Sequence, residues 1–379
     1  MSTTLLFIGV MSGSSLDGID VALTELPVSN RPNSNCSDSS CKVIATHFQP
    51  YDISIKNSLL ALHFPQESEL ESAALMANQL ARLYAEAVNA LLSKYNINPN
   101  QISAIGCHGQ TVRHQPRYKD DVGYTIQLGN NALLAELTNI TVVGDFRSRD
   151  IAAGGQGAPL VPAFHQAVFG RTDKNRAIVN IGGIANITYL AKTGEVLGFD
   201  SGPGNMLLDS WVKQNLGKDY DAHGEWASTG VVHESLLSAM LTEPYFSEAP
   251  PKSTGRDLFN DAWLKQYILP QNGQPQDVAR TLVALTAHTI NQAIKMHCPA
   301  VDEVYLCGGG AHNSLLVKDL NALLDTTVAN TDVLGVGVDW VEAVAFAWLA
   351  KQTLENKPSN LPNVTGALAP RILGAIFPH

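Results

Sequence analysis

Two stretches of this chain share one pattern, a strand that turns back on itself through glycine. An apolar run over 5–10 leads into a turn rich in Gly, Ser and Asp, and apolar residues then alternate with polar ones over 19–23. A second apolar run over 177–181 leads into Gly182-Gly183, and another strand pattern follows over 184–190. Apolar runs joined by short glycine turns predict antiparallel hairpins. Because the pattern recurs so far along the chain, it predicts a duplicated α/β fold of two lobes with a ligand cleft between them.

The sequence also supplies helices that could cover two such sheets. Helical patterns of apolar residues run over 67–95, 277–297 and 341–352. A chain of 379 residues is too long for one compact core and fits two domains of ordinary size. We expect one lobe to comprise 1–140 with 350–379, and the other to comprise 141–349.

Composition and charge exclude several classes of partner. The chain is 45% hydrophobic and 16% charged, which is typical of a globular protein. Its formal net charge of −10 leaves no basic surplus, so nucleic acid and anionic membranes are not expected as partners. Five cysteines without CxxC spacing argue against a disulfide framework and a zinc site. With no signal-peptide pattern and no apolar run of membrane-spanning length, we expect a cytoplasmic protein.

The first glycine turn carries groups that suit phosphate. Its glycines, hydroxyls and free backbone N–H groups, between Gly13 and Gly18, can bind an anion. Asp17 and Asp20 would repel bare phosphate, so they indicate an intervening cation or a proton-accepting role. An ordinary hairpin is the alternative. A third glycine turn, Gly308 to Gly310, follows another strand pattern, yet none of the three turns is GxxxxGK[ST] or GxGxxG, which disfavours the common phosphate-loop and dinucleotide folds.

Four further residues are candidates for chemistry. Asp200 precedes Gly202-Pro203-Gly204 and could be a general base, a cation contact, or only a turn residue. Arg147 and Arg149 lie beside Asp145 and Asp150, so they either pair with those carboxylates or offer a forked donor to a substrate carboxylate. Glu342 could be no more than a first-turn acid favoured by the helix dipole.

With these pieces in place, the chain resembles the anhydro-N-acetylmuramic acid kinases of the sugar kinase, heat-shock-70 and actin ATPase superfamily. The resemblance runs from Gly9 to about Gly374. It rests on strings that occur in order: MSGSSLDG at 11–18, GCHGQT at 106–111, DFRSRD at 145–150, GGQGAPL at 154–160, GFDSGPGN at 198–205 and CGGG at 307–310.

The resemblance implies a two-lobed, actin-like ATPase (duplicated ribonuclease H-like) fold. It also implies an enzyme that uses ATP and Mg²⁺ to open 1,6-anhydro-N-acetylmuramic acid with water and to phosphorylate O6, giving N-acetylmuramic acid 6-phosphate in peptidoglycan recycling. Another small-molecule kinase of the same fold, or an actin-like or chaperone-like ATPase module, is the alternative. We also expect a homodimer.

The resemblance assigns roles to residues as well. Asp200 would be the base that activates water, and Arg149 and Glu342 would hold the sugar. Asp17 would contact the sugar or the water shell of the metal. The ATP site would comprise Gly13, Ser14, Ser15, Leu16, Asp17, Gly18, Ile19 and Asp20 of the hairpin, together with Gly182, Gly183, Gly308, Gly309 and Gly310.

Overall fold

The computed structural model describes residues 4–13, 15–28, 41–118, 121–268 and 273–379. Ser14 and most of the loop expected over 30–42 therefore lie outside the described residues. The chain divides into two compact units, and each is described here by itself. Unit 1 is Met1–Val168 with Trp340–His379, and unit 2 is Phe169–Asp339.

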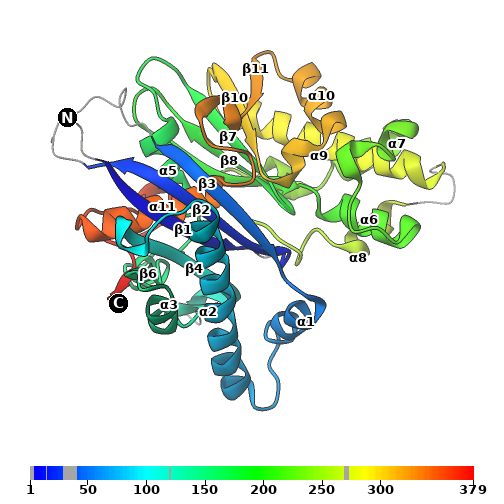
Figure 1. Ribbon diagram of the computed structural model, residues 1–379. Helices are drawn as coiled ribbons and strands as arrows, with labels where there is room; N and C mark the ends of the chain where they lie inside the picture. Colours follow the sequence, from blue (N-terminus) through cyan, green and yellow to red (C-terminus); the bar gives the residue numbers. More distant parts are fainter. Residues whose placement is uncertain (1–3, 14, 29–40, 119–120, 269–272) are drawn as a thin grey trace. The chain divides into compact units, whose positions relative to one another are not determined.

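Unit 1 is built on a mixed sheet (Figure 1). Its strands are, in spatial order, β12 (Ala375–Phe377), β6 (Val142–Gly144), β4 (Ile102–Tyr118), β1 (Thr4–Ser12), β2 (Gly18–Pro27) and β3 (Lys42–Pro50), and β5 (Asp121–Leu128) pairs with β4. β1, β2 and β3 form an antiparallel meander, as the first hairpin pattern predicts. β4 runs parallel to β1, and β6 runs parallel to β4.

Unit 2 repeats this arrangement. Its sheet has the spatial order β11 (Thr327–Asn330), β10 (Glu303–Cys307), β7 (Arg176–Ile181), β8 (Ile184–Leu190) and β9 (Val196–Pro203). β7, β8 and β9 are antiparallel neighbours, whereas β10 runs parallel to β7 and β11 parallel to β10. In both units, the first strand of an antiparallel meander therefore also pairs with a parallel strand on its other side. This duplicated ribonuclease H-like arrangement is that of the actin-like ATPases, so the predicted fold class is confirmed.

Helices cover both faces of the unit 1 sheet. They are α1 (Ile53–Ala61), α2 (Glu69–Lys94), α3 (Asn131–Thr138), α4 (Ser148–Ala152), α5 (Val161–Phe169), α11 (Val341–Leu354) and α12 (Pro362–Thr365), with a 3₁₀ turn at Pro99–Gln101. Ile8 and Val10 belong to one buried cluster with Leu80 and Tyr84 of α2. Successive residues of a strand face opposite sides, so Gly9 faces the other way, toward the backbone of α11. Figure 1 shows α2 in cyan and α11 in orange on the two faces.

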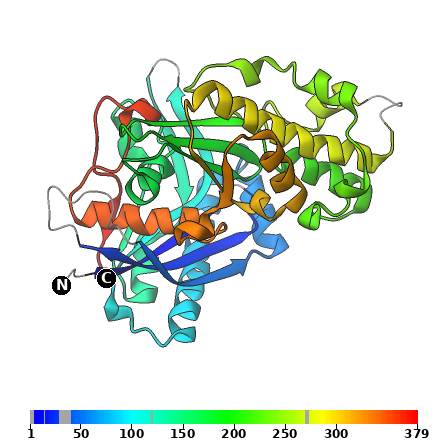
Figure 2. The same ribbon diagram turned by 90° about the horizontal axis from the view of Figure 1, so that it is seen from above.

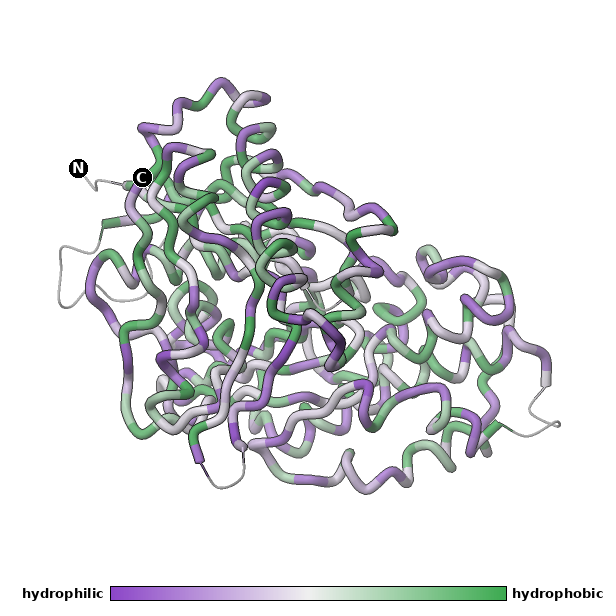
Figure 3. Tube along the Cα trace, turned by 90° about the horizontal axis from the view of Figure 1, so that it is seen from below, coloured by the Kyte–Doolittle hydropathy of each residue, from purple (hydrophilic) through white to green (hydrophobic). Residues whose placement is uncertain are grey.

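The helices of unit 2 gather around one long helix. They are α6 (Met206–Leu216), α7 (Glu234–Met240), α8 (Asp261–Tyr267), α9 (Pro275–His297) and α10 (Ser314–Leu323), with 3₁₀ turns at Ala222–Gly224, Ala227–Thr229, Pro244–Ser247, Gly309–His312 and Thr331–Leu334. In Figure 2, α9 in yellow lies beside α10 in darker gold. Hydrophobic and hydrophilic residues alternate along the helical traces (Figure 3), as expected of helices with one buried face.

Local patterns in the sequence predict a short strand over 102–107, a strand end just before Asp200, a loop over 145–159 and an irregular tail over 362–379. The structure differs at each of these places. The strand β4 continues past Cys107 through the HGQT string to Tyr118. Asp200 lies inside β9. The segment after Gly144 includes the short helix α4. The C-terminal tail contributes β12, which pairs with β6. Each difference depends on a partner distant in sequence, which a local pattern does not reveal.

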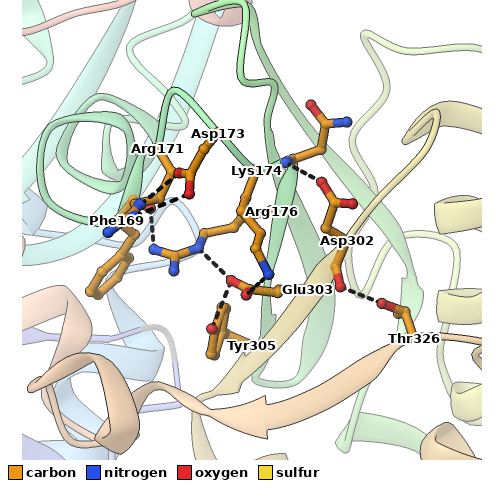
Figure 4. A network of polar contacts seen from close by, with 10 residues as sticks. Phe169, Arg171, Asp173, Lys174, Arg176, Asp302, Glu303, Tyr305 and Thr326 are labelled. Atoms are coloured by element: carbon orange, nitrogen blue, oxygen red, sulfur yellow. Dashed lines mark hydrogen bonds and ion pairs between the residues drawn. The ribbon is translucent and has the colours of Figure 1, made fainter. Parts of the chain in front are cut away.

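A charged network joins the starts of β7 and β10 in unit 2 (Figure 4). Glu303 accepts hydrogen bonds from Lys174 Nζ at 2.7 Å and Arg176 Nε at 2.9 Å, and Tyr305 Oη donates to it at 2.9 Å. Partial burial acts to raise the pKa of Glu303, but these three donors outweigh it and hold the pKa at about 2. Since the ordinary value is 4.5, the ionised form of Glu303 stabilises the folded unit.

We expect Glu303→Gln to lower the free energy of unfolding by about 2 kcal/mol at pH 7, because a pKa lowered by more than two units corresponds to about 3 kcal/mol and the amide keeps one acceptor. A group with a depressed pKa stabilises above its unfolded pKa, and this contribution disappears as the pH falls from about 5 toward 2. Urea denaturation of both proteins at pH 7 and pH 3 measures the difference, which should shrink at the lower pH. An equal difference at both values would contradict the prediction.

Candidate active site

The turn between β1 and β2 presents backbone and side-chain donors at the end of the unit 1 sheet. The Leu16 amide donates to the carbonyl of Gly13 at 3.3 Å, and Leu16 is buried with a φ of 59°. The Asp17 carbonyl accepts from the Tyr51 amide at 3.0 Å, while the side chains of Ser15 and Asp17 are exposed. The turn is therefore fixed through its backbone, with Ser15 and Asp17 open to a ligand. Gly18, Ile19 and Asp20 already belong to β2.

Two buried polar side chains, Gln110 and Ser12, hold this turn in place through hydrogen bonds. Gln110 of β4 accepts a hydrogen bond from the Ser12 hydroxyl and donates through Nε2 to the carbonyl of Gly13 at 3.1 Å. Ser12 Oγ also lies 2.8 Å from Tyr51 Oη, and burial raises the pKa of Tyr51 to about 12, so its hydroxyl stays protonated. Gln110 and Ser12 are both buried. Sequence reasoning gave Gln110 no role, although it lies within the GCHGQT string.

Glu342, Arg147 and His108 interact in the same unit. Arg147 donates through Nε and Nη2 to His108 Nε2, at 3.1 and 2.9 Å, and through Nη1 to the carbonyl of Gly157 at 2.8 Å. Burial and the guanidinium lower the pKa of His108 to about 3, so this histidine is neutral and can accept. Burial raises the pKa of Glu342, and Arg147 opposes that rise. Glu342 is half-buried in the first turn of α11 and interacts electrostatically with Arg147, so it is more than a first-turn acid at a helix end.

Arg149, the arginine assigned to the sugar by resemblance, has an exposed side chain on α4. Its neighbour Asp150 is fully buried and pairs elsewhere. It accepts from the Gly157 amide at 2.7 Å, from Asn360 Nδ2 at 2.7 Å and from Thr365 Oγ1 at 2.8 Å. Asp150 is thus a structural carboxylate that fixes α4, and α4 in turn places Arg149 at the surface of unit 1.

A cavity of about 310 Å³ opens in unit 1 between β4, β5 and the start of α4. Its polar lining includes His108, Thr125, Gln127, Asn131, Asp145 and Ser148. His108 therefore contacts both the cavity and Arg147. Hydroxyl, amide and carboxylate groups around a cavity of this size suit a small polar ligand.

The second and third glycine turns both lie in unit 2. The carbonyl of Gly182 accepts a hydrogen bond from the Asn205 amide at 2.8 Å, and that of Gly183 accepts one from the Met206 amide at 3.2 Å. These bonds connect the β7–β8 turn to the start of α6. A Cβ on either glycine would meet nothing closer than 3.6 Å, so a ligand can approach this backbone.

In the third turn, Gly308 has a φ of 78°, and a Cβ there would lie 2.3 Å from Asn180 Oδ1. A Cβ on Gly310 would lie 2.3 Å from Ile181 Cγ2, whereas the nearest atom to one on Gly309 would be 3.9 Å away. Gly308 and Gly310 therefore allow the turn to pack against β7, and Gly309 is the glycine that stays open.

Asp200 projects from β9 into a partly buried environment. Its Oδ2 accepts the Thr254 amide at 3.0 Å. Burial raises the pKa of Asp200 to about 6, although the Thr254 amide and the charge of Lys252 act to lower it. A carboxylate with a pKa in this range is ionised at neutral pH yet basic enough to take a proton from water.

Within the residues that the structure describes, no three or more His, Cys, Asp or Glu side chains gather so as to hold a metal ion. Mg²⁺ in phosphoryl-transfer enzymes needs only one or two carboxylates, with water and phosphate oxygens completing its shell. The exposed Asp17 carboxylate, in the turn between β1 and β2, fits that requirement. Also among the described residues, no helix is long and apolar enough to cross a membrane.

The fold and the glycine turns that follow β1, β7 and β10 define the class of the protein, an actin-like ATPase fold with a duplicated core. A solved structure described as the activator of the 2-hydroxyisocaproyl-CoA dehydratase from Clostridium difficile with bound ADPNP is similar over 93% of this chain and 97% of its own, with a TM-score of 0.45 and 12% identity. The fold assignment itself rests on the strand order.

Sequence comparison gives the particular family. A model of the anhydro-N-acetylmuramic acid kinase family matches residues 5–379. The anhydro-N-acetylmuramic acid kinase of Nitrosomonas europaea is 53% identical over 98% of this chain and 99% of its own length. That of Nitrosospira multiformis is 51% identical, over 98% of each chain. The chain belongs to the anhydro-N-acetylmuramic acid kinase family, and it is a kinase.

Proposed function

We propose that this kinase opens 1,6-anhydro-N-acetylmuramic acid with water and transfers the γ-phosphoryl group of ATP to O6. The product is N-acetylmuramic acid 6-phosphate, together with ADP. The environment of Asp200 is the observation that carries the proposal. Hydrolytic opening of the anhydro bridge needs a base that takes a proton from the water attacking the anomeric carbon. Phosphorylation of a free hydroxyl needs no base at that carbon. Burial holds the pKa of Asp200 at about 6, which suits that role.

In the proposed reaction, Asp200 accepts a proton from the water that attacks C1. The C1–O6 bond breaks, and the departing O6 attacks the γ-phosphorus in line, so that ADP leaves. The protein has little covalent work beyond this, and its other residues orient the two substrates and balance their charge. Turnover should fall as the pH drops below about 6, because protonated Asp200 cannot accept the proton.

The hairpin turn is proposed to bind the phosphates of ATP. Gly13 supports this, since a Cβ there would have no neighbour closer than 3.7 Å and the backbone is open to a ligand. Mg²⁺, when bound with ATP, would neutralise the phosphate charge, and Asp17 would hold its water shell or contact the sugar. Gly182, Gly183 and Gly309 add open backbone to the ATP site, with Gly308 and Gly310 shaping the adenosine part.

Arg149 and Glu342 are proposed to hold the sugar. We expect Arg149→Ala to raise the KM for the anhydro sugar at least about tenfold, as one charge-assisted hydrogen bond is worth about 1.5–3 kcal/mol. The melting temperature should change little, because the side chain is exposed. Arg82→Ala, which removes an exposed arginine from α2, is the matched control and should leave both quantities near the parent values. An unchanged KM for Arg149→Ala would remove this residue from the sugar site.

The proposed function is tested by supplying ATP, Mg²⁺ and 1,6-anhydro-N-acetylmuramic acid in ¹⁸O-labelled water. Mass spectrometry should find the label at C1 of a 6-phosphorylated product. A phosphorylated product that keeps its anhydro bridge would instead favour the second candidate, a kinase acting on an ordinary hydroxyl. Absence of turnover would refute the assignment.

We also propose that the protein works in the cytoplasm, where ATP is supplied, and that it forms a homodimer. Exposed apolar side chains at Ile53, Phe64, Leu70 and Leu75, on and between α1 and α2, support an association surface. Light scattering after gel filtration tests the oligomeric state.

A further inference from the structure

One segment of unit 2, residues 245–254, contacts Asp200 at three separate atoms. The Asp200 amide donates to the carbonyl of Lys252 at 3.2 Å. The Tyr245 hydroxyl donates to the carbonyl of Asp200 at 3.0 Å, and the Thr254 amide donates to Oδ2 at 3.0 Å. We call residues 245–254 the clamp segment. Its two ends fix both the backbone of Asp200 and one oxygen of its carboxylate.

Lys252 closes this segment on itself. Its side chain is only 8% exposed, and Nζ donates to the carbonyls of Tyr245 and Phe246 at 3.0 and 3.2 Å. Nζ also lies 4.7 Å from the centre of the Tyr245 ring, within the range of a cation–π contact. A buried ammonium is costly unless it is well partnered. These partners hold the ammonium inside the segment that contacts Asp200.

We propose that Lys252 is a positioning residue for Asp200, which it serves by closing the clamp segment and by placing a fixed positive charge close to the carboxylate. The inference rests on the proposed role of Asp200 as the base. Burial raises the pKa of Asp200, and the Thr254 amide and the ammonium of Lys252 both oppose that rise, so the carboxylate stays ionised at neutral pH.

The other titratable groups around the clamp segment are consistent with this role. Glu248 interacts with both Lys252 and Tyr245, and Asp257 interacts with Tyr245. Burial, followed by the charge of Lys252, lowers the pKa of His297, so this histidine is neutral at pH 7. Within the described part of the chain, Lys252 is therefore the cation that acts on Asp200. Burial lowers the pKa of Lys252, and the carboxylates of Glu248 and Asp200 oppose that fall.

The test compares the pH dependence of kcat for the parent with that of three variants of the full chain. Lys252→Met removes the charge and the donors, Lys252→Gln keeps a donor without the charge, and Lys252→Arg keeps the charge. We expect the acidic limb of the profile to move up by at least about half a pH unit in the Met and Gln variants, since loss of a nearby opposite charge raises a carboxyl pKa by about one unit or more. In the Arg variant, the limb should stay with that of the parent.

Lys351→Met is the matched control, because Lys351 is another buried lysine with a carboxylate partner, Glu355, but lies in unit 1. It should lower the melting temperature without moving the limb. A Lys252→Gln profile that coincides with that of the parent would overturn the proposal.

The role of Lys252 and the proposed reaction can be tested separately by NMR. The ¹³C-labelled aspartate carboxyls are titrated, and Asp200→Asn assigns the Asp200 signal. The Asp200 pKa should rise in Lys252→Gln even if the anhydro sugar proves not to be the substrate. An unchanged pKa would overturn the role of Lys252 and leave the proposed reaction standing.

Discussion

Asp200→Asn should abolish turnover of the anhydro sugar while leaving ATP binding nearly intact. The amide has the shape of the carboxylate and can still accept the Thr254 amide through its oxygen, so the clamp around β9 should persist. It cannot accept a proton from water, and general-base catalysis is worth about 10²–10⁴-fold. We therefore expect kcat to fall at least about 100-fold. Steady-state kinetics measure the loss, and calorimetric titration measures the Kd for ATP.

Asp219→Asn is the control for this substitution. Asp219 belongs to the same unit, pairs with Lys213 and has an 84% exposed side chain, so its removal should leave kcat near that of the parent. Turnover of Asp200→Asn within about tenfold of the parent would rule out the base assignment. A change in the Kd for ATP as large as the change in kcat would indicate that the variant has disturbed the fold.

Gly106→Val and Gly9→Val should each prevent unit 1 from packing as it does. A Cβ on Gly9 would lie 1.7 Å from the carbonyl oxygen of Ala343, and a Cβ on Gly106 would lie 2.0 Å from that of Phe346. Both oxygens belong to the backbone of α11, which cannot yield as a flexible side chain would. Since overpacking a core by even a few methylene groups costs about 1–3 kcal/mol, we expect a loss of about 3 kcal/mol or more when the clash is with backbone.

Thermal unfolding followed by circular dichroism checks this expectation. Gly13→Ala is the matched control, because the nearest neighbour of its Cβ would be Ser15 Oγ at an ordinary 3.7 Å. That variant should unfold near the temperature of the parent. Equal stability for Gly9→Val and Gly13→Ala would show that α11 does not lie as close to β1 as the structure places it.

Much of the candidate site could be located from the sequence, though not the environment that gives it chemistry. Asp200 stood out because it lies in a long, family-specific string before Gly202. Nothing near it in sequence indicated that residues 245–254 would bury it, or that Lys252 would lie beside it. The cause is spatial, because β9 and the clamp segment meet only after the chain has passed through α6 and α7.

Gly9 illustrates the same limit. The apolar run over 5–10 predicts a strand at this glycine, which β1 confirms, but only the structure shows that the missing side chain makes room for α11. Arg147 is similar. Its position beside Asp145 and Asp150 suggested ion pairs with them, but its hydrogen bonds go to His108 and Gly157.

The sequence by itself determined the duplicated strand–turn–strand plan, the long helices and the family. Alternation, helical periodicity and glycine turns are local properties, and a local pattern determines the type of an element before any packing occurs. Only the tertiary structure decided which glycines allow α11 to pack closely against the sheet. It also decided that Asp150 is a buried structural carboxylate and that Asp200 is a carboxylate whose pKa is raised. Those outcomes depend on burial and on charges brought together from distant parts of the chain, and both arise only when the sheets and helices have packed.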